Sequence, residues 1–240
     1  KATTDPRTTA TSAAMIVVIS HLESIDGISF GWLGIQGGWV GVQLFFVISG
    51  YLIIQSAFKY SAKEYFIHRF FRIFPAYLFW YIAFGLIGGK LMASAWADPY
   101  FYANLTLLHH FIPEAYLRYT FINPSWTLSV EWGWYIVAFL LALTHRKWML
   151  FWIIALTVVA TWWVAGGFTL HPLYTKLTAE PVYVYFFLNN NLIGQLPFFL
   201  FGSAIYFYRP KLPMLLVAAV SITILVTFNL WVDNFPNPIF

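Results

Sequence analysis

Repeated apolar runs, several of them close to 20 residues long, constrain this chain more than any other feature of its sequence. A helix needs about 20 apolar residues to cross about 30 Å of hydrocarbon. Of the 240 residues, 60% are hydrophobic and 9% are charged, whereas about a quarter of the residues in a soluble domain are charged. The alternating segments of a membrane barrel are not found. We therefore expect an all-α fold, a polytopic transmembrane helical bundle with about seven spans, at residues 10–22, 37–58, 73–89, 126–143, 148–165, 191–208 and 212–231.

The distribution of lysine and arginine predicts the orientation of this bundle, because these residues favour cytoplasmic loops. With a cytoplasmic N-terminus, ten of the 13 fall on the cytoplasmic side, and only Lys90, Arg118 and Lys176 fall outside. We therefore expect the N-terminus to be cytoplasmic. The net charge of +4 follows from these loops, so nucleic-acid binding is not expected. These residues include no cysteine, which excludes disulfides and thiol nucleophiles among them.

Few ionisable residues fall within the apolar runs, and each costs roughly 2.5 to 3.5 kcal/mol there on insertion scales. Glu131 lies about five residues inside the outer end of the fourth run, and His21 closes the first run at its outer end. A carboxylate and an imidazole at one depth suit a general base, with Glu131 orienting His21. The equal alternative is an interfacial histidine and a carboxylate that bonds a neighbouring helix.

Two arginines, Arg69 and Arg72, share one helix face within the aromatic, basic segment that precedes the third run. Two guanidiniums on one face suit a ligand that carries phosphate, since each can bind oxygens in a bidentate manner. Ordinary anchoring on the cytoplasmic side is the more common role of such residues. The sequence places this pair on the side of the membrane opposite Glu131.

Two serines, Ser125 and Ser129, flank Trp126 close to Glu131. All three are candidates for contact with substrate, and a serine could also act as a nucleophile, although serines in membrane helices more often bond the backbone. The adjacent pair at 109–110 consists of histidines that point apart, unlike zinc ligands spaced at i and i+4. No metal site is expected.

Four stretches, in their order and spacing, resemble the membrane-bound acyltransferase 3 family, bacterial enzymes that O-acylate surface and secreted carbohydrates. The stretches are His21 in the first run, GVQLFFVISGYLI at 41–53, RFFRIFPAY at 69–77 and SWTLSVEWGWY at 125–135. Residues 136–240 resemble the family only as further spans. One departure is Ala10, which stands where family members usually carry an arginine.

The resemblance implies a multi-pass enzyme of the bacterial inner membrane that moves an acyl group, commonly acetyl, from cytoplasmic acyl-CoA to a sugar hydroxyl outside. It implies His21 as catalytic base, with Arg69 and Arg72 at the donor and Trp126 and Glu131 in a further functional signature. Acyl-CoA is then a donor substrate, and no permanently bound cofactor is expected. The acyl group reaches the acceptor directly or through a covalent intermediate.

We expect residues 1–240 to form one transmembrane domain of this type, truncated at its C-terminus, because the family generally has more than seven spans. The sequence leaves the oligomeric state open. The main alternative is a transporter or flippase for a glycan or an anionic solute, which also uses ionisable residues in the membrane. That alternative predicts internal repeats, and none is convincing here. A non-catalytic scaffold, in which the arginines and Glu131 are dispensable, is a third possibility.

Overall fold

The protein is described by a computed structural model that covers residues 35–89, 93–177, 186–188 and 190–208. Within these ranges every regular element is a helix, which agrees with the expected all-α fold. The apolar runs expected at 10–22 and 212–231 lie outside the described residues, as does His21. The number of seven spans and the cytoplasmic N-terminus therefore remain predictions.

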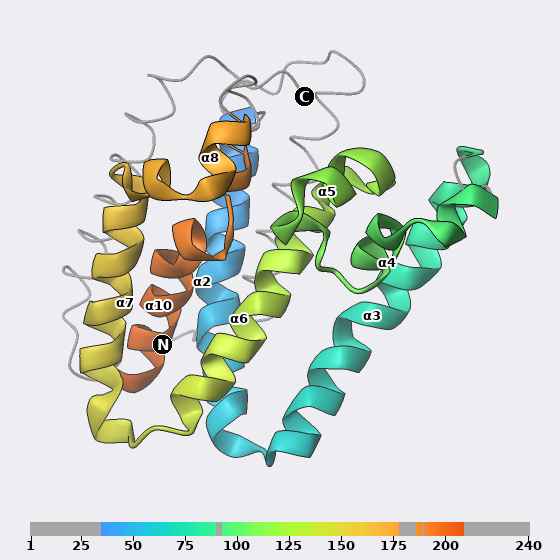
Figure 1. The fold of residues 1–240 in the computed structure, drawn as a ribbon. Helices are drawn as coiled ribbons and strands as arrows, with labels where there is room; N and C mark the ends of the chain where they lie inside the picture. The colour runs from blue at the N-terminus through green and yellow to red at the C-terminus, as the bar shows by residue number, and fades with distance from the viewer. Residues whose placement is uncertain (1–34, 90–92, 178–185, 189, 209–240) are drawn as a thin grey trace.

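Five longer helices run up and down the molecule in alternation (Figure 1). They are α2 (Ile35–Lys59), α3 (Ala62–Ile87), α6 (Trp126–Ala142), α7 (Met149–Val164) and α10 (Leu192–Tyr208). Three helical segments are long and apolar enough to cross a membrane, at Val40–Lys59, Ala62–Ile87 and Arg146–Val164. Helices α6 and α10 are apolar but shorter.

Two hairpin turns, from α2 to α3 and from α6 to α7, lie at one end of the bundle, and short helices fill the connections at the opposite end (Figure 1). The connection from α3 to α6 contains η2 (Ala93–Ala97), α4 (Pro99–Leu105), η3 (His109–Phe111), α5 (Pro113–Tyr119) and η4 (Asn123–Ser125). Helices η6 (Gly167–Leu170) and α8 (Pro172–Leu177) follow α7 at the same end, whereas η5 (Arg146–Trp148) lies in the turn between α6 and α7.

Helices α2 and α10 cross at backbone contact because each has a glycine at the crossing point. A Cβ atom added to Gly50 would lie 2.1 Å from the carbonyl oxygen of Phe199, and one added to Gly202 would lie 1.9 Å from that of Val47. Only glycine permits this approach, which is the usual way for membrane helices to pack closely. The crossing fixes α10 against α2 at the centre of the bundle.

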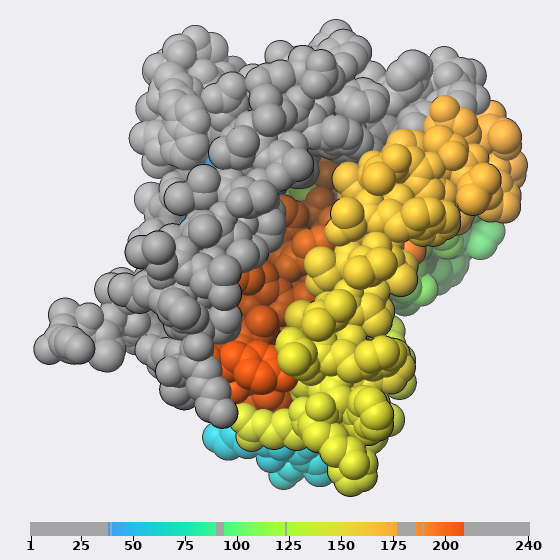
Figure 2. Space-filling model, turned by 90° about the vertical axis from the view of Figure 1, so that its left-hand side faces the viewer, coloured from blue at the N-terminus to red at the C-terminus, as the bar shows by residue number. Residues whose placement is uncertain are grey.

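Helix α7 lies on the outside of the bundle, with α10 set deeper beside it (Figure 2). Its outward side chains are large and apolar, and Leu150, Ile154, Val158 and Trp162 are each more than half exposed. A surface of this kind suits contact with lipid rather than water.

Helix α3 begins 11 residues earlier than the sequence predicts, because Ser61 and Glu64 form a capping box at its N-terminus. The two arginines, expected on a helical segment before the span, therefore lie in the same helix as the span itself. Helix α3 leans away from α6 (Figure 1). Tyrosine hydroxyls hold it at several points: Tyr65 donates to the carbonyl of Tyr135 on α6 at 2.9 Å, and Tyr77 donates to that of Asn104 at 2.8 Å.

Candidate active site

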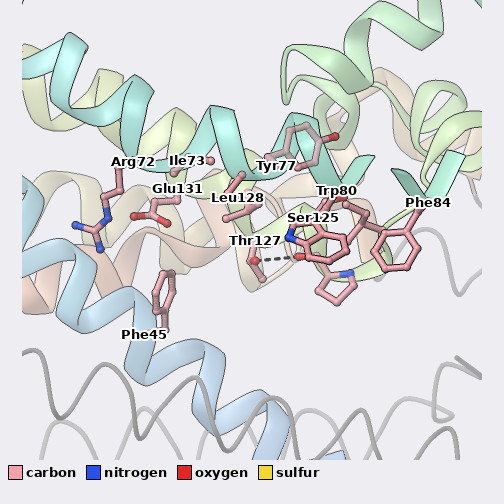
Figure 3. Close-up of a pocket in the computed structure, with 13 residues that line it drawn as sticks. Phe45, Arg72, Ile73, Tyr77, Trp80, Phe84, Ser125, Thr127, Leu128 and Glu131 are labelled. Atoms are coloured by element: carbon pink, nitrogen blue, oxygen red, sulfur yellow. Dashed lines mark hydrogen bonds between the residues drawn. The ribbon is translucent and has the colours of Figure 1, made fainter. Parts of the chain in front are cut away.

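A cavity of about 700 Å³ lies between α3 and α6, with one side chain of α2 on its wall. Its two ends differ: Arg72, Glu131 and Phe45 lie at one end, and Trp80, Ser125 and Phe84 lie at the other (Figure 3). The remaining wall is mostly apolar and is formed by Ile73, Ala76, Tyr77, Ile122, Pro124, Thr127 and Leu128. The cavity is thus an apolar slot with charge at one end and a serine hydroxyl at the other.

Glu131 is almost fully buried, at 2% exposure, and two hydroxyl groups donate to one of its carboxylate oxygens. Tyr135, one helical turn further along α6, donates to Oε1 at 3.0 Å, and Ser49 of α2 donates to the same atom at 3.4 Å. Burial disfavours the charged form of this carboxyl group, whereas the nearby guanidiniums of Arg72 and Arg69 favour it. In the part of the chain that the structure describes, the one ion pair within 4.0 Å joins Arg118 and Asp98, at 3.5 Å. Glu131 therefore faces the arginines without direct contact.

The two arginines have different environments, although the sequence suggests the same role for both. Arg72 is exposed and lines the cavity. Arg69 is 7% exposed, and its guanidinium carbon lies 5.7 Å and 5.5 Å from the ring centres of Tyr65 and Tyr135. Its Nε atom is buried without a hydrogen-bond partner. Arg72 is therefore the arginine that a molecule in the cavity meets, and Arg69 supports the charge of Glu131 from behind.

The expectation that Glu131 and the arginines lie on opposite sides of the membrane is wrong. Glu131 and Arg72 line the same end of one cavity. The physical reason is the early start of α3, which carries Arg72 about ten residues, or roughly 15 Å, into the helix. The expected pairing of Glu131 with His21 concerns a residue outside the described ranges.

The three predicted substrate contacts occupy different positions. Ser125 lines the cavity. Trp126 is not a wall residue and packs edge-on against Phe46, with the ring centres 6.2 Å apart. Ser129 is fully buried and donates to the carbonyl of Leu107 at 2.6 Å. Of these three, only Ser125 is a wall residue of the cavity, and the other two anchor α6 to its neighbours.

Two buried histidines, His109 and His110, are residues that sequence reasoning set aside. His109 Nε2 lies 3.0 Å from the Oγ atom of Ser125, and His110 Nε2 lies 3.1 Å from the carbonyl oxygen of Asn190. Burial lowers the pKa of His109 to about 3 and that of His110 to about 4, so both are neutral at pH 7. Their adjacency in the sequence, which argues against a zinc site, does not indicate that one of them faces a serine of the cavity. Among the described residues no group of three potential metal ligands occurs.

A bundle of apolar helices is typical of a membrane protein, and a buried carboxylate and an arginine beside a cavity make that cavity its candidate functional site. Within that class, the chain belongs to the acyltransferase 3 family, because the sequence model of the family's acyltransferase domain matches residues 12–233. This confirms the resemblance drawn from the motifs, and with it an acyltransferase assignment. Comparison with curated proteins and with solved structures found no match.

Proposed function

We propose that the protein is a multi-pass O-acyltransferase of the bacterial inner membrane. It moves an acyl group, acetyl in the first instance, from cytoplasmic acyl-CoA to a hydroxyl of an extracytoplasmic glycan, such as lipopolysaccharide O-antigen or exopolysaccharide. Family membership supports the acyltransferase chemistry. The observation that supports acyl-CoA as the donor is the cavity, which has Arg72 at one end and apolar walls beyond it.

The two ends of the cavity match the two ends of an acyl-CoA molecule. The guanidinium of Arg72 suits the phosphates, because it presents several donors in a fixed plane. The apolar wall beyond it, which includes Ile73, Ala76 and Leu128, suits the uncharged arm that carries the thioester. The donor then lies along α3, with its acyl group directed toward Ser125.

Glu131 and His21 divide the remaining roles. Glu131 sits beside Arg72, where its charge holds the guanidinium in position for the donor and balances it when the cavity is empty. His21, the base implied by the family resemblance, takes the proton of the sugar hydroxyl as that hydroxyl attacks the acyl carbonyl. Acyl-CoA serves as a substrate in this scheme and leaves as coenzyme A.

Transfer of radiolabelled acetyl from acetyl-CoA to envelope glycan tests this proposal. Membranes with the wild-type protein are compared with membranes that contain an equal amount of the His21→Ala variant. We expect label in the glycan with the wild type and a loss of at least about 100-fold in the variant, the usual effect of removing a general base. Equal transfer by both would contradict the role of His21, and no transfer by either, with acceptor present, would contradict the choice of donor.

A further inference from the structure

A serine and a histidine meet at the end of the cavity opposite Arg72. Ser125 lines the cavity wall, and its Oγ atom lies 3.0 Å from His109 Nε2. Both residues are almost fully buried, at 2% and 0% exposure. A hydroxyl within hydrogen-bond reach of an imidazole is the arrangement that activates a nucleophile.

Ser125 does not use its hydroxyl to cap the helix that it begins. Ser125 is the N-cap residue of α6, a place where a serine side chain usually accepts a bond from the first turn of the helix. Here the side chain makes no such bond. Its hydroxyl faces His109 instead, so the serine contributes to a contact across the fold rather than to its own helix.

The imidazole of His109 lies between two serines. Ser129 donates its only proton to the carbonyl of Leu107, and its oxygen lies 3.4 Å from Nε2 and 3.5 Å from Nδ1 of His109. Of the two tautomers, the one with its proton on Nδ1 leaves the lone pair of Nε2 facing Ser125, as the role of a base requires. Stacking on Tyr77 and Tyr116, with ring centres at 6.4 Å and 5.8 Å, holds the ring in this orientation.

We propose that Ser125 receives the acyl group from the donor as a covalent ester, with His109 as its base. This inference rests on the function proposed above and answers the choice between direct transfer and a covalent intermediate. Ser125 lies six residues before Glu131 on α6, roughly 9 Å along the axis. A donor anchored at Arg72 and extended along the cavity brings its thioester to the end where Ser125 lies.

Two steps complete the transfer. In the first, the hydroxyl proton of Ser125 passes to His109 Nε2 while Oγ bonds to the thioester carbon. The carbon–sulfur bond then breaks, and the leaving sulfur takes the proton from His109. In the second step, the sugar oxygen bonds to the acyl carbon and the bond to Ser125 Oγ breaks. Oγ recovers a proton from His109, which has received it from the sugar hydroxyl, either directly or by way of His21.

The test is to trap the acylated protein. Full-length protein in membranes is incubated with radiolabelled acetyl-CoA without acceptor, denatured, and mapped by mass spectrometry. We expect to find acetyl on Ser125. The label should resist neutral hydroxylamine, because it is an oxygen ester and residues 1–240 contain no cysteine that could form a sensitive thioester. Addition of acceptor glycan should discharge the label. The variant Thr157→Val, which removes a hydroxyl of α7 outside the cavity, should label as the wild type does.

Two variants make the result specific. Ser125→Cys keeps a nucleophile at the same position, and we expect its label to become sensitive to neutral hydroxylamine, as a thioester is. His109→Gln should reduce labelling by at least about 100-fold. The proposal is overturned if the wild type transfers acetyl to glycan while no label forms on Ser125, or if Ser125→Ala transfers acetyl at the wild-type rate. Those results leave the proposed function standing, whereas absence of any transfer by the wild type overturns both.

Discussion

At the scale of single residues, the charge of Glu131 is the feature that a purely structural role does not require. Glutamine in its place would keep the shape and would still accept from Tyr135 and Ser49. It would leave Arg72 and Arg69 without an opposing charge. We expect Glu131→Gln to fold normally and to lose about 10-fold to 100-fold in acetyl transfer, a loss of roughly 1.4 to 2.7 kcal/mol. Transfer assays on membranes with matched protein levels measure this.

A folded Glu131→Gln protein with wild-type transfer would show that the carboxylate serves only to join helices. The variant Tyr135→Phe is the matched control, because it removes one hydrogen bond to Glu131 and leaves the charge in place. We expect it to affect transfer less than Glu131→Gln does.

The two arginines should respond differently to the same substitution. Arg72→Lys keeps a positive charge at the cavity wall but loses bidentate binding. We expect the KM for acetyl-CoA to rise about 10-fold with unchanged thermal stability. Arg69→Lys loses the planar contact with Tyr65 and Tyr135, and we expect it to lower stability by about 1 kcal/mol. Kinetics and thermal unfolding of both variants measure the difference, and the reverse pattern would contradict the assignment of Arg72 to the donor.

The sequence identified Glu131 because an ionisable residue in an apolar run needs a partner, and it identified Arg72 because this residue shares a helix face with Arg69. It could not distinguish Arg69 from Arg72, since that difference depends on which tyrosines of α3 and α6 face each guanidinium. The contact of His109 with Ser125 could not be predicted from the sequence either. It depends on how the connection between α3 and α6 folds back, and helical periodicity does not indicate the path of such a connection.

At the scale of elements, the apolar pattern predicts most boundaries of the long helices closely, but it misses the start of α3. The predicted run at 126–143 differs from α6 by one residue, because apolar composition and a helix end coincide there. Helix α3 continues N-terminally through a basic, aromatic segment, so a hydropathy boundary near residue 73 missed its first 11 residues. That error in turn misplaced Arg72 relative to Glu131.

The crossing of α2 and α10 gives an element-scale prediction. In Gly202→Ala the new Cβ atom would meet the backbone of Val47, which cannot move without shifting the helix. In Gly133→Ala the nearest atom, at 2.9 Å, belongs to the flexible side chain of Leu192. We expect Gly202→Ala to lower the thermal stability clearly and Gly133→Ala to change it little. Thermal unfolding in detergent compares them, and equal stability of the two variants would contradict the close crossing.

At the scale of the whole molecule, the hairpin turns gather positive charge at one end of the bundle. The turn between α2 and α3 has Lys59 and Lys63 close by, and the turn between α6 and α7 carries Arg146 and Lys147 (Figure 1). Because lysine and arginine favour the cytoplasm, this end should face it. The connection that contains α4 and α5 then faces outward.

Single cysteines can test this orientation, because residues 1–240 contain none. His145→Cys places a thiol in the turn before α7, and Glu114→Cys places one on α5 at the other end; both positions are exposed. We expect an impermeant maleimide to label Glu114→Cys in intact spheroplasts and His145→Cys only after lysis. The opposite pattern would reverse the orientation of the bundle.

We infer that the cavity between α3 and α6 holds the acyl donor during transfer. Ala76 lies on its wall between the charged end and Ser125, so a larger side chain there should block the slot. The most direct measurement compares acetyl transfer by Ala76→Phe with transfer by Val158→Phe, which adds a ring on the exposed face of α7. We expect Ala76→Phe to fold but to lose transfer, and Val158→Phe to keep it. Wild-type transfer by Ala76→Phe would contradict this role of the cavity, because the donor would then have to bind elsewhere.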